Sequence, residues 1–81
     1  MWVVARYDFE FDRFVFYTGA PGHHDLMAEP SASRFYATLF PCPNEATALA
    51  NKGWFAVPFH MAARLESIGK PVIERKKFYA R

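Results

Sequence analysis

The stretch RFYATLFPCPNEATALANKG, residues 34–53, carries the clearest structural signals in the chain. Residues 34–40 are rich in aromatic and β-branched side chains, which suit a pleated, half-buried surface. Apolar side chains fall on both faces, so we predict a central strand that is covered at least in part on both sides. Pro41 would end this strand, because proline has no N–H to give to a sheet ladder.

The second half of the same stretch predicts a capped helix. Pro43 suits the first helical position, and Glu45 falls three residues after Cys42, in the place of a capping box. Apolar or small residues then recur at helical spacing and form a narrow stripe for close packing on a sheet: Ala46, Leu49, Ala50 and Gly53. Gly53 is expected to adopt the left-handed conformation that ends many helices.

The sequence before this unit predicts an antiparallel hairpin. Trp2–Asp12 alternates, with one apolar face made of Val3, Ala5, Tyr7, Phe9 and Phe11 and one charged face made of Arg6, Asp8, Glu10 and Asp12. A turn near residues 11–13 would return the chain as a second strand over Phe14–Thr18. Residues 19–33 have no regular pattern and are expected to form a long loop.

The sequence after Gly53 predicts a second helix and an edge strand. Residues 54–58 suit a short link or strand, and the helix FHMAARLESIG (59–69) has an apolar stripe of Met61, Leu65 and Ile68. Val72–Ala80 has charges in its middle, as edge strands often do. We therefore predict one compact α+β domain over residues 1–81. Its mainly antiparallel sheet has about four strands, with one or two helices packed on one face, in the order β-β-β-α-α-β.

Aromatic residues are the outstanding feature of the composition. The 81 residues include nine Phe, four Tyr and two Trp, and such rings serve either as core or as anchors for a partner. Trp2 and Trp54 are the first candidates for anchors, with burial in the core as the alternative. A single cysteine excludes an internal disulfide, and the sequence has neither a signal-peptide pattern nor a membrane span. A cytoplasmic location is expected.

Residues that often carry catalysis or bind metals do not form a recognisable pattern. His23, His24, Asp25, Cys42 and His60 lack the short, fixed spacings of zinc sites. A pair of Cys42 and His60 has no nucleophile signature around it, and the chain has no P-loop and no dinucleotide-binding glycine motif. We therefore expect no metal, no cofactor and no enzymatic activity.

Charge distribution points to binding of a macromolecule. Asp8, Glu10 and Asp12, with the loop residues His23, His24 and Asp25, would form a surface that attracts a basic protein. The alternative is nucleic-acid binding through the basic end of the chain: Lys70, Arg75, Lys76, Lys77, Tyr79 and Arg81. A third hypothesis is a homo-oligomer, such as a homodimer, that extends its sheet through Val72–Ala80.

The segment ATLFPCPNEA (Ala37–Ala46), which follows an aromatic hairpin, resembles a strand-to-helix corner found in small orphan proteins of phages and mobile elements. Anti-CRISPR proteins, which bind and block bacterial CRISPR effector complexes, include domains of this size and build. The resemblance implies a non-enzymatic inhibitor whose partner is a host protein or ribonucleoprotein complex. The motif covers a structural corner and transfers no binding residue.

Overall fold

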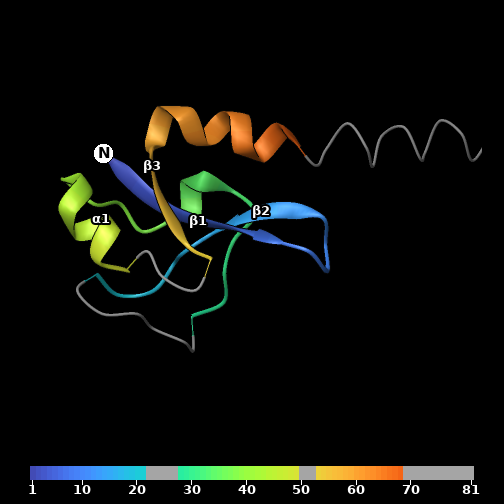
Figure 1. The fold of residues 1–81 in the computed structure, drawn as a ribbon, viewed down its shortest axis with the longest axis horizontal. Helices are drawn as coiled ribbons and strands as arrows, with labels where there is room; N and C mark the ends of the chain where they lie inside the picture. Colours follow the sequence, from blue (N-terminus) through green and yellow to red (C-terminus); the bar gives the residue numbers. More distant parts are fainter. Residues whose placement is uncertain (22–27, 50–52, 69–81) are drawn as a thin grey trace, which may run out of the picture.

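The computed structural model describes residues 1–21, 28–49 and 53–68 of the chain (Figure 1). Its elements are β1 (Trp2–Asp8), β2 (Arg13–Phe16), the short 3-10 helix η1 (Arg34–Tyr36), α1 (Pro43–Leu49), β3 (Phe55–Pro58) and a helix over residues 59–68. The three strands form one antiparallel sheet in the order β2-β1-β3. The described residues therefore form a small α+β fold with an antiparallel sheet, as the sequence predicts.

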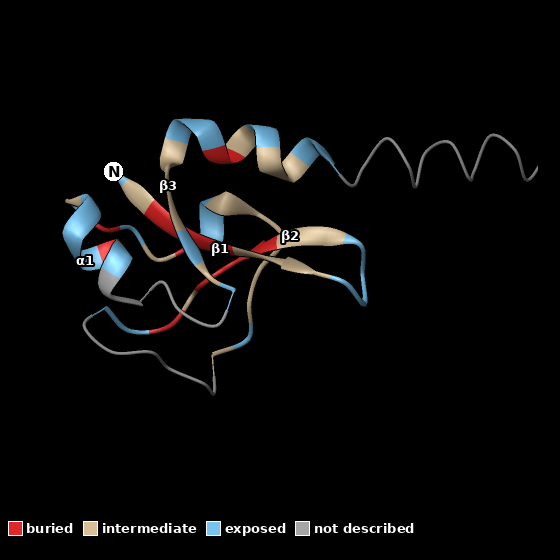
Figure 2. Cartoon of the chain, viewed as in Figure 1, coloured by how far each residue is buried: buried red, intermediate tan, exposed pale blue. Residues whose placement is uncertain are grey.

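The central strand of the sheet is β1. Three consecutive residues, Val3, Val4 and Ala5, are buried, so both faces of this part of the strand are covered (Figure 2). In the register of the sheet, Ala5 lies opposite Phe16 of β2 on one side and opposite Phe55 of β3 on the other. Two neighbouring strands satisfy the backbone of β1, so the first half of this strand can be buried on both faces.

Two hydrophobic clusters lie on opposite faces of β1. Side chains of one face pack with the 59–68 helix in a cluster of Val3, Ala5, Phe16, Ala37 and Ala62, with Val57, Phe59 and Leu65 against it. Those of the other face pack with α1 in a cluster of Val4, Tyr17, Phe40 and Ala46, with Trp2, Trp54 and Ala56 against it. Because successive residues of a strand face opposite sides, the two helices cover opposite faces. The prediction of helices on one face is therefore wrong.

Residues 34–40 do not form the predicted central strand. Ser33 caps η1 by accepting a hydrogen bond from the Phe35 amide, and the Tyr36 amide donates to the Ser33 carbonyl at 3.2 Å. Such local side-chain bonds compete with a sheet ladder. Only Phe40 joins the sheet, through two 2.8 Å backbone hydrogen bonds with Trp2. The central position that the aromatic pattern suggested is occupied by β1 instead.

The first predicted helix is confirmed at its start. α1 begins at Pro43, Ala46 is fully buried, and Gly53 has a φ of 92°, in the left-handed region as expected. Residues 50–52, which connect α1 to Gly53, lie outside the described part of the chain.

The second helix begins after Pro58 as predicted, but of its predicted stripe only Leu65 packs against the core. Met61 and Ile68 are 42% and 53% exposed, whereas Ala62 is fully buried. The small side chain of Ala62 lets the helix lie close to the sheet, with Phe59 and Leu65 on either side of it. The helix therefore packs on the core through Phe59, Ala62 and Leu65, rather than through Met61, Leu65 and Ile68.

The predicted edge strand Val72–Ala80 lies outside the described residues, among which the sheet has three strands. None of the helices in the described part of the chain is long and apolar enough to cross a membrane.

Candidate functional site: the end of the β1–β2 hairpin

The turn between β1 and β2 is shaped by Asp8. Its Oδ1 accepts hydrogen bonds from the amides of Glu10 (3.0 Å) and Phe11 (3.4 Å), which ends the strand at Asp8 rather than at Asp12. Asp12 closes the turn with a φ of 55°, a left-handed conformation that aspartate tolerates better than most residues. The predicted alternation to Asp12 is therefore interrupted after β1.

Early termination of β1 moves two predicted core residues into solvent. Phe9 is 87% exposed and Phe11 is 64% exposed, in a turn whose other two residues are Glu10 and Asp12. The prediction that Phe9 and Phe11 face the core is wrong, because the turn no longer follows the pleat of the strand. The turn instead presents two phenylalanines and two carboxylates together.

Behind the turn lies a row of four aromatic rings on one face of the sheet. The Tyr7 ring is edge-to-face with Phe9 (4.9 Å between centroids) and with its cross-strand neighbour Phe14 (5.0 Å), and Phe14 is edge-to-face with Phe55 at 6.0 Å. These contacts are the favourable geometry for aromatic pairs. We call Tyr7, Phe9, Phe14 and Phe55 the aromatic row. It occupies the same sheet face as the 59–68 helix.

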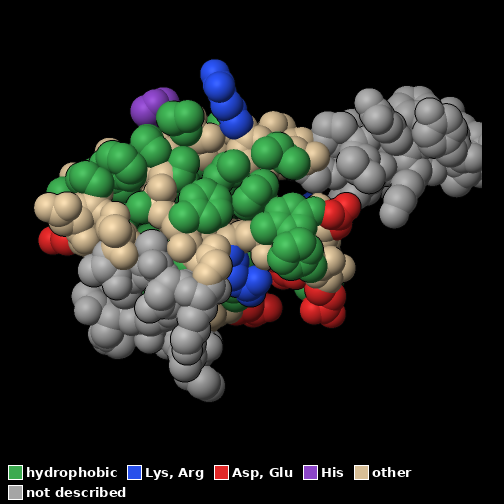
Figure 3. All heavy atoms as spheres, viewed as in Figure 1, with side chains coloured by type: hydrophobic (Ala, Val, Ile, Leu, Met, Phe, Trp, Pro, Cys, Tyr) green, Lys and Arg blue, Asp and Glu red, His purple; other side chains and the backbone are tan. Residues whose placement is uncertain are grey.

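Negative charge borders the aromatic row. The Tyr7 hydroxyl donates a hydrogen bond to Asp12 Oδ1, and this bond, with lesser effects of desolvation and of the Asp12 charge, raises the pKa of the Tyr7 phenol. Glu10 and Asp12 are both exposed, and within residues 1–21, 28–49 and 53–68 the one salt bridge is Arg34–Glu66. Figure 3 shows hydrophobic and acidic side chains side by side over this end of the hairpin.

The opposite face of the hairpin holds a groove of about 310 Å³. Alternate residues of β1 and β2 line it, namely Arg6, Asp8, Arg13 and Val15. The turn and the segment after residue 27 supply the remaining lining residues: Phe11, Glu29, Pro30 and Ala32. The Arg6 guanidinium lies 5.1 Å from the centre of the Trp54 ring. Charges of both signs line the groove in equal number, so it favours no single type of ion.

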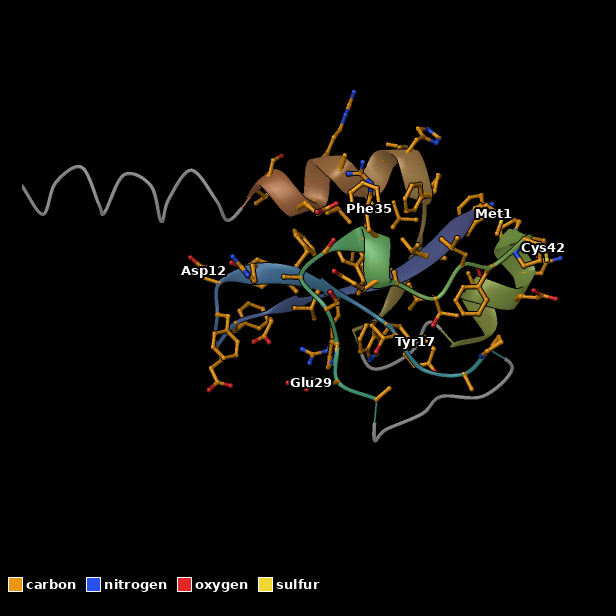
Figure 4. The ribbon with its side chains drawn as sticks, turned by 180° about the vertical axis from the view of Figure 1, so that it is seen from behind. Met1, Asp12, Tyr17, Glu29, Phe35 and Cys42 are labelled. Carbon is orange, nitrogen blue, oxygen red and sulfur yellow. The ribbon has the colours of Figure 1, made fainter. Side chains whose placement is uncertain are left out.

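The structure brings some of the predicted site residues together. Asp8, Glu10 and Asp12 all lie at the hairpin end, although in a turn rather than along one strand face. Figure 4 places Asp12 at the opposite end of the molecule from Met1 and Cys42. The remaining predicted site residues lie outside the described part of the chain: His23, His24 and Asp25, and the basic set Lys70, Arg75, Lys76, Lys77, Tyr79 and Arg81.

The two tryptophans suspected as anchors are half-buried against the cluster under α1. The exposed aromatic residues of the hairpin end are Phe9 and Phe11, which the period-two pattern places on the core face. The sequence signal that identifies them is Asp8, whose side chain can cap a turn two or three residues ahead.

Two residues with catalytic potential, Cys42 and His60, lie in the described part of the chain. Cys42 is a half-buried free thiol just before α1, and His60 is exposed near the start of the 59–68 helix. Among the described residues, no group of three His, Cys, Asp or Glu side chains could hold a metal ion. Comparisons with protein-family models, with curated proteins and with solved structures gave no match.

Proposed function

We propose that this protein is a non-enzymatic binding protein that docks on a protein partner through the end of its β1–β2 hairpin. The observation that carries the proposal is the exposure of Phe9 and Phe11 at 87% and 64%. Full burial of a phenylalanine is worth about 1.5–3 kcal/mol, and the hairpin forgoes this gain twice in four residues. Exposed aromatic side chains beside polar ones are typical of residues that become buried on binding.

The concrete form of the proposal is an inhibitor from a phage or mobile element that binds a host protein or ribonucleoprotein complex, as anti-CRISPR proteins do. Its support is the resemblance of Ala37–Ala46, together with the small α+β build and the exposed hairpin end. In the strand half of that motif, residues 37–39 follow η1 without forming a strand and only Phe40 bridges to the sheet, so the Pro43 helix start is the part that still matches the pattern. Nucleic-acid binding through residues 70–81 is the competing proposal, and the experiment below separates the two.

The test is affinity capture from bacterial lysate, with and without nuclease, comparing three forms of the chain. These are the unmodified protein, the double variant Phe9→Ala/Phe11→Ala and the control Tyr36→Ala, which removes an exposed ring on η1. We expect a protein that is captured by the unmodified chain and the control, withstands nuclease and is lost with the double variant. Thermal melting should show that all three forms are folded.

Two results would reject this proposal. Capture of the same proteins by the double variant would show that the hairpin end is not the docking surface. Recovery of nucleic acid alone, or of proteins that disappear after nuclease treatment, would favour the basic residues at the end of the chain.

A further inference from the structure

We propose that the hairpin end recognises arginine side chains of a basic partner segment, which stack on the aromatic row and pair with Glu10 and Asp12. The inference rests on the proposed function and names the chemistry of the partner. The turn, residues 9–12, contributes two exposed carboxylates and no basic residue, while the flanking pair Asp8 and Arg13 lies on the opposite face of the sheet and carries no net charge. A surface of this kind attracts a cationic partner and repels nucleic acid.

The aromatic row offers ring faces on which a cation can bind. Cations bind over the faces of aromatic rings, within about 6 Å of the centroid. In the described residues, the cation–π contacts fall on Trp54, Phe35 and Phe59, and none involves a ring of the aromatic row. Edge-to-face packing fixes the rings relative to one another while Phe9 stays mostly exposed, so the row offers ring surface at little entropic cost.

The same molecule contains an internal example of this recognition. The Arg34 guanidinium lies 4.6 Å from the centre of Phe35 and 5.2 Å from that of Phe59, while its Nη1 donates to Glu66 Oε1 at 2.9 Å. The hairpin end has the same two ingredients, rings and carboxylates. One oxygen of Asp12 is already bonded to Tyr7, which holds the carboxylate at the edge of the row and leaves the other oxygen to accept from a guanidinium.

The geometry favours arginine over lysine. A guanidinium is planar, stacks on rings and donates to a carboxylate from a fixed fork, whereas an ammonium does neither as well. An isosteric citrulline keeps the shape and loses the charge. The order of binding should therefore be arginine first, then lysine, with citrulline and glutamate far weaker.

The experiment is a titration of the full chain with short Gly/Ser peptides that carry three arginines, followed by NMR of backbone amides. Matched peptides carry lysine, citrulline or glutamate at the same places, and a single-stranded oligonucleotide serves as the anionic probe. We expect shifts centred on residues 7–14. The double variant Glu10→Gln/Asp12→Asn should bind the arginine peptide about tenfold more weakly, because it loses both carboxylates. Asparagine keeps the left-handed turn conformation.

The control Glu45→Gln removes an exposed carboxylate from α1 and should leave binding unchanged. The inference is overturned if citrulline binds as well as arginine, if Glu10→Gln/Asp12→Asn binds normally, or if the oligonucleotide is bound at residues 7–14. A captured partner separates the two proposals. If Phe9→Ala/Phe11→Ala loses it but the carboxylate variant keeps it, the arginine chemistry is wrong and the docking function stands. If neither variant loses it, the docking function is wrong too.

Discussion

Arg34 of η1 contacts two residues of the 59–68 helix, Phe59 and Glu66. Its guanidinium lies close to the rings of both Phe35 and Phe59 and pairs with Glu66, and both partners of the salt bridge are mostly buried. Arg34 Nε is also buried and has no hydrogen-bond partner among the described residues. Ring stacking and the ion pair together offset that cost, because desolvation strengthens both.

Replacing Arg34 with alanine should therefore lower the free energy of unfolding by about 1–3 kcal/mol, between the values for exposed and for buried ion pairs. Arg34→Lys should recover only part of the loss, because lysine keeps the charge but not the planar stacking. Urea denaturation followed by circular dichroism measures both. Arg64→Ala, on the exposed side of the same helix, is the control and should change stability by no more than about 0.5 kcal/mol. Equal effects of the two alanine variants would contradict this role of Arg34.

The hydrogen bond between Tyr7 and Asp12 predicts a pH dependence. Ionisation of the phenol would place a second negative charge against the carboxylate, so the bond raises the Tyr7 pKa above its ordinary value of 10.0. A raised pKa in the folded state means that the bond stabilises the fold below pH 10.0, and this contribution is lost as pH rises through the folded-state pKa.

Asp12→Asn should return the Tyr7 pKa toward its ordinary value, because it removes the charged acceptor. NMR of the Tyr7 ring between neutral and alkaline pH measures this change. Glu10→Gln serves as the matched variant, because it removes a neighbouring charge but leaves the hydrogen bond between Tyr7 and Asp12 in place. A Tyr7 pKa that falls equally in both would show that the general negative charge of the turn, not the hydrogen bond, is responsible.

At the scale of elements, the position of the 59–68 helix depends on Ala62. This residue is fully buried in the cluster with Val3 and Ala5, both strand residues with short side chains. Close approach of helix and sheet requires small residues at the contact, and interior packing leaves little room for additional atoms.

Ala62→Leu should destabilise the fold by about 1–3 kcal/mol, because the added methyl groups would push the helix away from β1. Met61→Leu is the matched variant on the exposed side and should stay within about 0.5 kcal/mol of the unmodified protein. Chemical denaturation of both variants provides the measurement. If Met61→Leu were the more harmful change, the stripe predicted from hydrophobicity would be the buried one.

At the scale of the whole molecule, β1 separates two cores that share no cluster members. Phe16 is fully buried in the core under the 59–68 helix, and Phe40 is fully buried in the core under α1. Neither helix can be removed without exposing one face of the central strand. The described fold should therefore unfold as one cooperative unit, although its cores are separate.

Phe16→Leu and Phe40→Leu should each cost about 1–2 kcal/mol, since each leaves a void in a packed core. Because the two residues belong to different clusters, the double variant should lose the sum of the single losses within about 0.5 kcal/mol. Denaturant unfolding monitored by both far-ultraviolet circular dichroism and tryptophan fluorescence tests this. Two separate transitions, or a strongly non-additive double variant, would mean that β1 does not join the cores as described.

The sequence by itself determined the α+β class, the hairpin, the start of α1 at Pro43 and the left-handed Gly53. Each of these depends on short-range physics: period-two alternation, the fixed φ of proline and the conformational freedom of glycine. It also predicted that Asp8, Glu10 and Asp12 would lie together on one strand face, and the structure places them together at the hairpin end, although in a turn.

Only the tertiary structure decided which strand is central, which faces the helices cover and which aromatic residues remain exposed. Residues 34–40 and β1 have similar apolar content, but Ser33 draws the first into a 3-10 turn while two neighbouring strands satisfy the backbone of the second. Phe9 and Phe16 are the same residue type, and only their positions relative to the Asp8 turn make one exposed and the other buried. Burial depends on long-range pairing, and local residue patterns do not encode the partner of each strand.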